Sequence, residues 1–557
     1  MASVNRRHFV SSAAAFALGT RAADALSEPT TAPALQFQTS LRERLQTRAE
    51  LSQYAETSSN TDVERFLTAL DLRGAPVQRG LLGVSARGRP IPYVVSSRPM
   101  ILDGEDAHKS RKPVVFIVAN GRANEPDGKE AALAVLRDLA VATDHTLLED
   151  LVLVVIPNLD VDGNANLVPV ALSAPTLNGP ARVGTARDGA SIDLERDFIA
   201  LQSYAVRQLV DLAKYWNPDV YIDLRTGATS LTTFALTYAP SAHPAAFYGG
   251  TYARDTMLPE LRTQIKTKFG IDAFTAGGFG KNGPLSFPTP GVELGWYAPD
   301  GSARLGSNYF GIRGVAAIAG YAYPHDTFER RVFSLRAFLS TALQYCSDKS
   351  DEIIARTKTA AHWTTGAVPV RTARDPHASG QELISWQRPA IDPSPRDREV
   401  GLPPGEHLDG RFQTSSTPVF DRFAGTFYAQ QPYAYAVDVA NAPLARQMLA
   451  RHGVHFDVRE QATTYEGESF VPRRVERVAQ SDGTRATVAE GAWMRGVFTL
   501  AAGSLLVLGE QPLGPLVSLL LEPQSDDGLV TLHVFDATLA AGREHAVRRV
   551  TAVQASS

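Results

Sequence analysis

The chain has 557 residues, too many for one hydrophobic core, and its length indicates two or three domains. Hydrophobic residues make up 44% and charged residues 20%, the composition of an ordinary folded protein. Because Lys+Arg is 55 against Asp+Glu 59, a net charge of −4, we expect neither nucleic acid nor an anionic membrane as partner. The single cysteine, Cys346, excludes an internal disulfide and is predicted to be a buried apolar residue rather than a nucleophile.

Residues 1–25 have the pattern of a targeting segment. The pair Arg6-Arg7 precedes a weakly apolar run, 10–19, and Ala23-Asp24-Ala25 offers a small-x-small cleavage site. We predict a twin-arginine signal peptide and export to the periplasm or the extracellular space; the alternative is a chance pair of arginines. The run is too short to span a bilayer, and no later stretch is long and apolar enough to be a membrane anchor.

The first strong structural signal is a run of apolar residues, 114–119, bounded by Pro113 and Asn120-Gly121. It predicts a buried strand, preceded by a polar helical region over 36–72 and by two strands over 79–97. A polar loop containing Arg122 and Glu125 follows, and then a helix over 129–143. The end of a strand that leads through a loop into a helix is where an open α/β sheet usually places its functional site.

The next elements repeat this α/β alternation. A second buried strand is predicted over 151–156 and a third over 220–224, which follows a helix over 202–214. Since side chains alternate along a strand, Asp223 and Arg225 are expected to share one face of the sheet. A further strand over 234–238 and a helix over 258–269 continue the pattern, which predicts an α/β domain.

Several of these stretches resemble the zinc metallocarboxypeptidases of the carboxypeptidase A type. In that family the loop after the core strand carries a His-x-x-Glu pair of zinc ligands, followed by Asp-Gly-Lys/Arg-Glu. Here Glu125 and the run 127–130 are retained, but Arg122 stands at the place of the histidine. The stretch Tyr221–Arg225 matches the family segment that ends in the third ligand, a histidine, and that place is taken by Arg225.

The resemblance also locates the residues that would bind a substrate. Residues 193–198, DLERDF, are similar to the family's Asp-Leu-Asn-Arg-Asp-Phe/Tyr, whose Asn-Arg pair holds the terminal carboxylate of the substrate. Arg196 is retained, but Glu195 replaces the asparagine and would repel a carboxylate. The arginine that polarises the scissile carbonyl in the family corresponds to Arg182 or Arg187.

The general base of the family is a glutamate in a Glu-x-Tyr segment, and its place here falls on Ala319 or Gly320, neither of which can take a proton. The resemblance covers residues 36–346 and implies a carboxypeptidase-type mixed sheet sandwiched by helices. Residues 347–416, rich in Pro, Arg, Asp and Gly, are predicted to be an irregular linker. Residues 417–557 are predicted to form a smaller, β-rich α+β accessory domain with a helix over 442–451 and short strands beyond 459. This part resembles the C-terminal region of long exported bacterial members of the family.

The substituted residues bear directly on metal binding. A catalytic zinc needs about three protein ligands, usually imidazoles and a carboxylate. Arginine is always protonated and offers donors only, so Arg122 and Arg225 remove two ligands and add positive charge where the dication would lie. At ~4 Å and an effective dielectric of ~20, each such contact costs about 4 kcal/mol per unit charge. Two of them would cancel most of the ~10–16 kcal/mol typical of zinc affinity. We therefore predict no zinc, no other cofactor and no catalysis.

Two interpretations of the altered site remain open at this stage. In the first, Arg122, Glu125 and Arg225 form a buried ion triad that only fills the former metal cavity. In the second, the triad has a net charge of +1 and, with Arg196, forms a cleft that binds a peptide C-terminus or another carboxylate without cutting it. The alternative to both is an active zinc peptidase.

That active peptidase would need relocated metal ligands. The candidates are Asp160, Asp162, Asp223 and His243. No two of them show the spacing of a ligand pair on one element.

Overall fold

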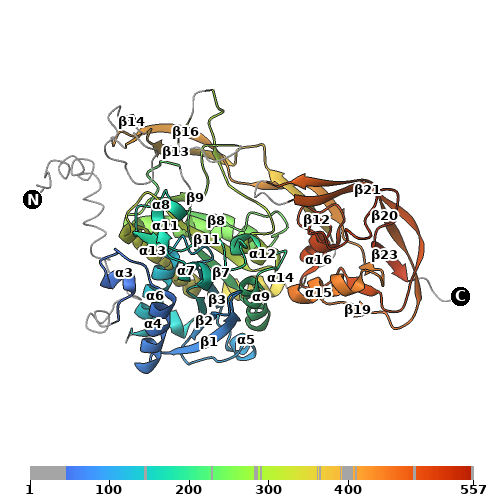
Figure 1. Cartoon of the computed structure of the whole chain (residues 1–557), viewed down its shortest axis with the longest axis horizontal. Coiled ribbons are helices and arrows are strands. Elements are labelled where there is room, and N and C mark those ends of the chain that lie inside the picture. The colour runs from blue at the N-terminus through green and yellow to red at the C-terminus, as the bar shows by residue number, and fades with distance from the viewer. Residues whose placement is uncertain are drawn as a thin grey trace, which may run out of the picture.

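An eight-stranded mixed sheet forms the centre of the N-terminal part of the chain, with strand order β1-β2-β4-β3-β7-β11-β8-β9 (Figure 1). The four central strands, β4, β3, β7 and β11, are parallel, whereas β1, β2 and β8 each run antiparallel to a neighbour. The strands are β1 (Val77–Val84), β2 (Pro90–Ser96), β3 (Val114–Ala119), β4 (Val152–Ile156), β7 (Val220–Thr226), β8 (Leu236–Pro240), β9 (Ala273–Thr275) and β11 (Ala316–Ala322).

The structure is a computed structural model that describes residues 45–142, 147–227, 230–281, 287–288, 291–360, 362, 366–388, 390–391, 406–407, 410–480 and 485–553. The predicted twin-arginine signal peptide, 1–25, lies outside these residues. Within them, no helix has the length and apolar character that a bilayer crossing would need.

Helices cover both faces of the sheet, which explains why β3 and β4 are apolar along their whole length. The helices α4 (Asn60–Leu72), α6 (Asp127–Ala140), α11 (Leu258–Phe269) and α13 (Phe328–Asp348) pack on one face. The helices α5 (Gly104–Ser110), α9 (Tyr204–Trp216) and α12 (Gly306–Ile312) pack on the other. The predicted α/β architecture, a mixed sheet sandwiched by helices, is confirmed.

Shorter elements connect this framework. They are α3 (Arg48–Leu51), α7 (Val161–Ala165), α8 (Val170–Ser173), α10 (Gly249–Tyr252), β5 (Val168–Pro169), β6 (Arg182–Val183), β10 (Trp296–Tyr297), the 3-10 turns η2 (Leu147–Glu149) and η3 (Leu194–Arg196), and the π-helical turn η4 (Ala253–Met257). The turn η3 matters most for function, because it brings the segment 193–196 to the carboxyl edge of the parallel strands.

Residues 347–416 differ from the expected irregular linker. Their described part contains a helix and strands: α14 (Ser350–Ala360), β12 (Ala367–Arg374), β13 (Gly380–Trp386), β14 (Ala390–Ile391), β15 (Glu406–His407) and the start of β16 (Gln413–Phe420). Strands β13 and β16 form a sheet with β10 and pack on an aromatic cluster that includes Phe274 and Trp296. The prediction was wrong because these strands bury side chains on one face only, so their apolar content is low.

The C-terminal part forms a second sheet, of order β19-β22-β18-β23-β20-β21, with two helices against it. Beyond residue 459 the chain forms the predicted short strands and also two long ones, of 17 and 16 residues, whose exposed polar side chains hid their length. The predicted β-rich α+β character is confirmed. The elements are β17 (Phe423–Gln430), which pairs with β12, and β18 (Ala434–Val437), α15 (Ala442–His452), β19 (Asp457–Val458), β20 (Thr463–Ala479), β21 (Arg485–Leu500), β22 (Leu505–Leu508), α16 (Gly514–Leu521) and β23 (Val547–Val553).

The C-terminal part packs against the face of the first sheet that carries α9 and α12, and one apolar core runs across both parts. Buried His452, at the end of α15, contacts Tyr309 Oη at 3.0 Å and the carbonyl oxygen of Ile199 at 3.1 Å. Nearby, Arg304 Nε and the amide of Ala303 donate to the carboxylate of Asp527. The C-terminal part therefore holds the 299–305 loop, which leads toward the candidate site.

Gly128 lets α6 begin directly against β7. A Cβ atom at this position would collide with the carbonyl oxygen of Leu224. This close approach brings the loop before α6 beside the end of β7, where Arg225 lies.

We expect Gly128→Ala to lower the free energy of unfolding by about 1–3 kcal/mol, because the added methyl group would push α6 away from β7. The matched control is Gly121→Ala, since a Cβ at Gly121 meets no atom within 4 Å. Urea denaturation of both variants measures the effect. Equal stabilities would contradict the close approach of α6 to β7.

Candidate functional site

The candidate site lies at the carboxyl ends of the parallel strands β3 and β7. Arg122 and Glu125 come from the loop between β3 and α6, and Arg225 is the second-last residue of β7. Glu125 Oε2 accepts a hydrogen bond from the Thr226 amide at 3.1 Å, which ties the loop to the strand. Asp223 and Arg225 lie on one face of β7 and contact each other at 3.8 Å, as the alternation of the strand predicts.

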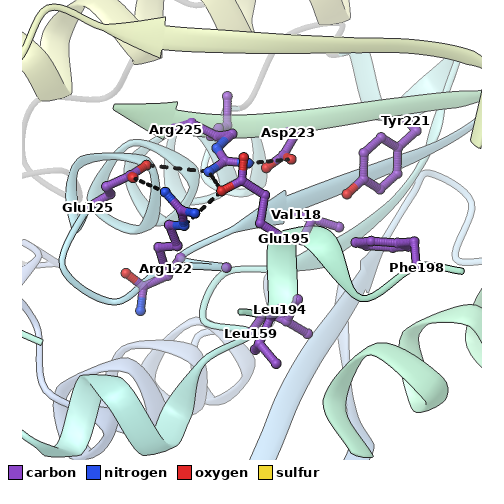
Figure 2. A pocket seen from close by; sticks show the side chains of 13 residues that line it. Val118, Arg122, Glu125, Leu159, Leu194, Glu195, Phe198, Tyr221, Asp223 and Arg225 are labelled. Carbon is purple, nitrogen blue, oxygen red and sulfur yellow. Dashed lines mark ion pairs between the residues drawn. The ribbon is translucent and has the colours of Figure 1, made fainter. Parts of the chain in front are cut away.

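Glu195, from η3, lies between the two arginines (Figure 2). Its Oε2 is 2.8 Å from Arg122 Nε and in direct contact with Arg225 Nη2. Glu125, the expected centre of the triad, is more distant, at 3.8 Å from each guanidinium group. Arg122 also pairs with Asp193.

The expected triad with a net charge of +1 is therefore wrong. Two arginines face four carboxyl groups, those of Glu125, Glu195, Asp193 and Asp223, which gives a formal charge of −2. The prediction failed because Glu195 was placed only in the substrate pocket, whereas η3 turns its side chain into the position between the arginines. We call this group of six residues the ion cluster.

Burial controls the protonation of the ion cluster. It raises the pKa of Glu125 to about 7 and that of Asp223 to about 6, against the opposing effect of Arg225. For Arg225, burial acts to lower the pKa, but Glu195 and Glu125 raise it well above its ordinary value. The pKa of Arg122 is raised in the same way, by Glu195 and Asp193 against burial. Both guanidinium groups therefore stay protonated and have no lone pair for a metal.

The retained motif run 127–130 has a structural role here. Asp127 Oδ1 accepts from Arg331 Nε at 2.9 Å, and both side chains are fully buried. Lys129 Nζ donates to the carbonyl oxygen of Ser58, and Glu130 Oε1 accepts from the Ser58 amide at 2.6 Å. These contacts fix the start of α6, and with it the loop that carries Arg122.

The other predicted binding arginines lie apart from the ion cluster. Arg196 forms an ion pair with Asp300 through both terminal nitrogens. Arg182 donates to the carbonyl oxygen of Leu167 at 2.6 Å, and Arg187 to that of Ser191 at 3.1 Å. Neither Arg182 nor Arg187 lines the cavity beside the ion cluster, so the structure does not bring them to the site. Arg182 lies in β6, which pairs with β5, and Arg187 follows that strand, so this short pairing directs both away from the site.

The two candidate positions for the general base lie on opposite faces of β11. Ala319 is opposite Asp223 in the parallel pair of β11 and β7, so it faces the site. A Cβ on Gly320 would collide with Phe338 of α13, on the other face. Ala319 is therefore the position that faces the site, and its methyl group cannot take a proton.

The possible relocated metal ligands do not come together. Asp160 caps α7 by accepting from the Gly163 amide at 2.8 Å. Asp162 pairs with Arg89 at 2.7 Å. His243 is buried and accepts from a backbone amide, and burial lowers its pKa to about 3. Among the described residues, no group of three or more His, Cys, Asp or Glu side chains is arranged to hold a metal ion.

Zinc does not fit the donor set of the ion cluster. The two places that would need neutral imidazoles hold cations, and the carboxylates around them are already within ion-pair distance of those cations. Any dication would have to displace a guanidinium group from its carboxylate partners.

A cavity of about 810 Å³ opens beside the ion cluster. Sequence reasoning missed four of its polar lining residues, Lys281, Asp300, Tyr321 and Arg374. Tyr321 could have been found, because it is the tyrosine of the Glu-x-Tyr segment, and its ring lies 5.8 Å from the Arg225 guanidinium carbon. Arg374 belongs to β12, outside the stretch that resembles the family, so no local signal pointed to it.

We expect Arg225→Met to lower the free energy of unfolding by about 3–5 kcal/mol, because buried carboxylates would lose their main counter-charge. The control is Arg79→Met, whose ion pair with Glu64 is half-exposed and should contribute about 1 kcal/mol or less. Chemical denaturation at neutral pH compares the two. A loss no larger than that of the control would show that the ion cluster is not a stabilising unit.

The ion cluster should also make stability depend on pH. The pKa of Glu125 is raised in the folded state, so its contribution is fully present below about pH 4.5 and is lost as pH rises through about 7. Relative to Glu125→Gln, the wild type should lose up to about 3 kcal/mol between those values. Urea denaturation at pH 4.5, 6 and 7.5 measures the difference between the two proteins. A difference independent of pH would show that Glu125 titrates as an ordinary carboxyl group.

We compared the chain with known protein families, sequences and structures. Residues 66–230 match the sequence model of the family described as zinc carboxypeptidase. No curated protein sequence matches the chain at a significant level.

Similar solved structures include a metallo-carboxypeptidase from Burkholderia cenocepacia, with 14% identity over 53% of this chain and 70% of that chain and a TM-score of 0.38. The carboxypeptidase A from Helicoverpa armigera has 14% identity over 56% and 80% of the two chains and a TM-score of 0.38. Both scores are low, so the similarity rests on the matched sequence model together with the retained Glu125 and the 127–130 run. By these features, residues 66–230 are similar to the zinc carboxypeptidase family.

Proposed function

We propose that this protein is a non-catalytic member of the zinc carboxypeptidase family that binds no zinc and holds a carboxylate-bearing ligand, such as a peptide C-terminus, in its 810 Å³ cavity. The observation that carries this proposal is the position of Glu195 Oε2, which bridges Arg122 and Arg225 where the family has two zinc histidines.

The bridge argues for a metal-free site more strongly than the loss of two histidines does. A lost ligand leaves a gap that water or another side chain can fill. Here the two cations and the carboxylate satisfy one another, and Arg225 is almost fully buried, with 9% of its side chain exposed. Replacing this contact by a dication would leave two buried guanidinium groups beside it, a cost that outweighs the ordinary affinity for zinc.

The absence of a general base argues against hydrolysis independently of the metal. Peptide hydrolysis needs a group within hydrogen-bond reach of the attacking water that can take its proton. Ala319 faces the site at the family position and cannot do so. The raised pKa of Glu125 would suit a base, but its carboxylate accepts from the Thr226 amide and faces both arginines.

The cavity supports a binding role. Its volume lies within the ~300–1,000 Å³ typical of small-ligand sites. One part of its wall is made of small residues between Ala276 and Gly280, which leaves room for an extended ligand, and Tyr297 and Tyr321 offer aromatic surface. Lys281 and Arg374 add positive charge outside the ion cluster, which favours an anionic ligand. We place this binding outside the cytoplasm, on the strength of the Arg6-Arg7 segment.

Metal content tests the proposal. Protein purified without chelator should contain much less than one zinc per chain by elemental analysis, and it should not hydrolyse peptides in a chelator-sensitive way. Stoichiometric zinc with chelator-sensitive hydrolysis would overturn the proposal and favour an active zinc peptidase with unforeseen ligands.

A restored variant gives the positive control. It combines Arg122→His, Arg225→His, Glu195→Asn and Ala319→Glu, which removes the bridge and returns the family's ligands and base. We expect zinc uptake by this variant alone, since imidazoles replace the guanidinium groups beside Glu125. A variant with only Ala319→Glu should stay metal-free, and zinc uptake by that single variant would show that the arginines do not exclude the metal.

A further inference from the structure

Arg196, the residue that holds the substrate carboxylate in the family resemblance, already has a carboxylate partner in this protein. Both of its terminal nitrogens contact Asp300 Oδ2, and Asp300 Oδ1 accepts from the Ser302 amide at 2.7 Å. The Asp300 carboxylate thus takes the position on the Arg196 guanidinium group that a ligand carboxylate would take. The 299–305 loop that delivers Asp300 is itself held by Asp527 of the C-terminal part.

Arg374 lines the same cavity and has a different set of partners. Its Nε and Nη2 donate to the carbonyl oxygen of Ala298, at 3.2 and 2.6 Å, and its Nη1 donates to that of Lys281 at 2.9 Å. Its guanidinium carbon lies 5.4 Å from the centre of the Tyr297 ring. Within the described part of the chain, no carboxylate forms an ion pair with Arg374.

The donor count of Arg374 leaves a suitable pair for a ligand. A guanidinium group has five N–H donors, and these contacts use one on each nitrogen, so one N–H remains on each terminal nitrogen. Two N–H groups on neighbouring nitrogens match the two oxygens of a carboxylate. The three carbonyl contacts also hold the guanidinium plane in place, so little side-chain freedom would be lost on binding.

The charge balance points the same way. The arginines of the ion cluster and Arg196 all have carboxylate partners within the protein. The partly buried charge of Arg374 instead contacts carbonyl oxygens and the Tyr297 ring, and it has no carboxylate partner among the residues that the structure describes. Burial lowers the pKa of Arg374, with Tyr297 and Asp300 acting in the opposite direction. A ligand anion would supply the missing counter-charge to this cation.

We propose that Arg374, and not Arg196, is the residue that binds the carboxylate of the ligand in this cavity. The inference rests on the proposed function, since it assumes that the cavity takes a carboxylate. It gives the C-terminal half of the chain a part in the site, because β12 lies beyond residues 66–230 and is paired with β17 and packed near α16. The family's anion site would thus be closed by Asp300 and replaced by one on β12.

The test compares binding of an N-acetylated tripeptide with a free C-terminal carboxylate and of the same tripeptide as its C-terminal amide, by isothermal titration calorimetry on the full chain. The wild type should bind the free acid and bind the amide at least about 10-fold more weakly. Arg374→Gln should weaken binding of the free acid by about 10- to 100-fold, the loss of a charge-assisted bidentate contact, and leave the amide unaffected.

Two further variants separate charge from geometry. Arg374→Lys keeps the charge but loses the fork, and we expect an intermediate loss of about 10-fold. The double variant Arg196→Gln with Asp300→Asn removes the internal pair without changing the net charge, and it should bind the free acid within about 3-fold of the wild type. Thermal unfolding of each variant shows whether it is folded. If Arg374→Gln does not fold, the binding measured for Arg374→Lys decides the outcome.

The outcomes are distinguishable. If the wild type binds neither tripeptide, or binds acid and amide equally, the cavity is not a carboxylate site and the proposed function fails with the inference. A different result overturns the inference alone: the wild type prefers the free acid, the double variant no longer binds it, and both Arg374 variants still do. In that case Arg196 holds the ligand after displacing Asp300.

Discussion

The contact of the Glu195 carboxylate with both Arg122 and Arg225 is the interaction on which the character of this site depends. Two guanidinium groups so close together would repel each other and would be costly to bury. One carboxylate between them, together with those of Glu125, Asp193 and Asp223, offsets that cost by forming a network of ion pairs. In the sequence, the glutamate at the place of the family's asparagine looks only like damage to the substrate pocket. In the structure, this Glu195 carboxylate is the counter-charge of Arg122 and Arg225, which stand at the two substituted ligand positions.

The framework around this network keeps several residues that the sequence shares with the zinc carboxypeptidases. Gly128 still brings α6 against β7, and Asp127 still ties α6 to α13 through Arg331. These contacts position the loop with Arg122 and Glu125 whether the site holds imidazoles or guanidinium groups. Retained motif residues can thus preserve the shape of a site after its chemistry has changed, because they serve the fold.

The cavity beside the network is built jointly by the two parts of the chain. Asp527 holds the loop that presents Asp300, and β12 supplies Arg374. The core continues from α9 and α12 to α15, with His452 as a buried contact between them, and this burial lowers the pKa of His452 to about 3. The C-terminal part is therefore more than an appended module, since it holds the loop that carries Asp300 and pairs, through β17, with the strand that carries Arg374.

The sequence by itself determined the local features of this protein. Apolar runs of five or six residues marked β3 and β4, the alternation of β7 placed Asp223 and Arg225 on one face, and the motif spacing located Arg122, Glu125 and Arg225 together. These features depend on neighbours in sequence or on a pattern along one strand, so they can be read from the chain. The strands β13 and β16 were missed, because their one buried face leaves little apolar signal.

Only the tertiary structure decided what surrounds each charged group. The position of Glu195 between two arginines, the pairing of Asp300 with Arg196 and the contacts of Arg374 join residues that are 30 to 104 positions apart in the chain, and no local pattern specifies them. Electrostatic character is a property of all charges within a few ångströms, whatever their order in the sequence. For that reason the substitutions at the metal ligands were evident from the sequence. The net charge of the site was not, nor was the place of Arg374, which pairs with no carboxylate among the described residues.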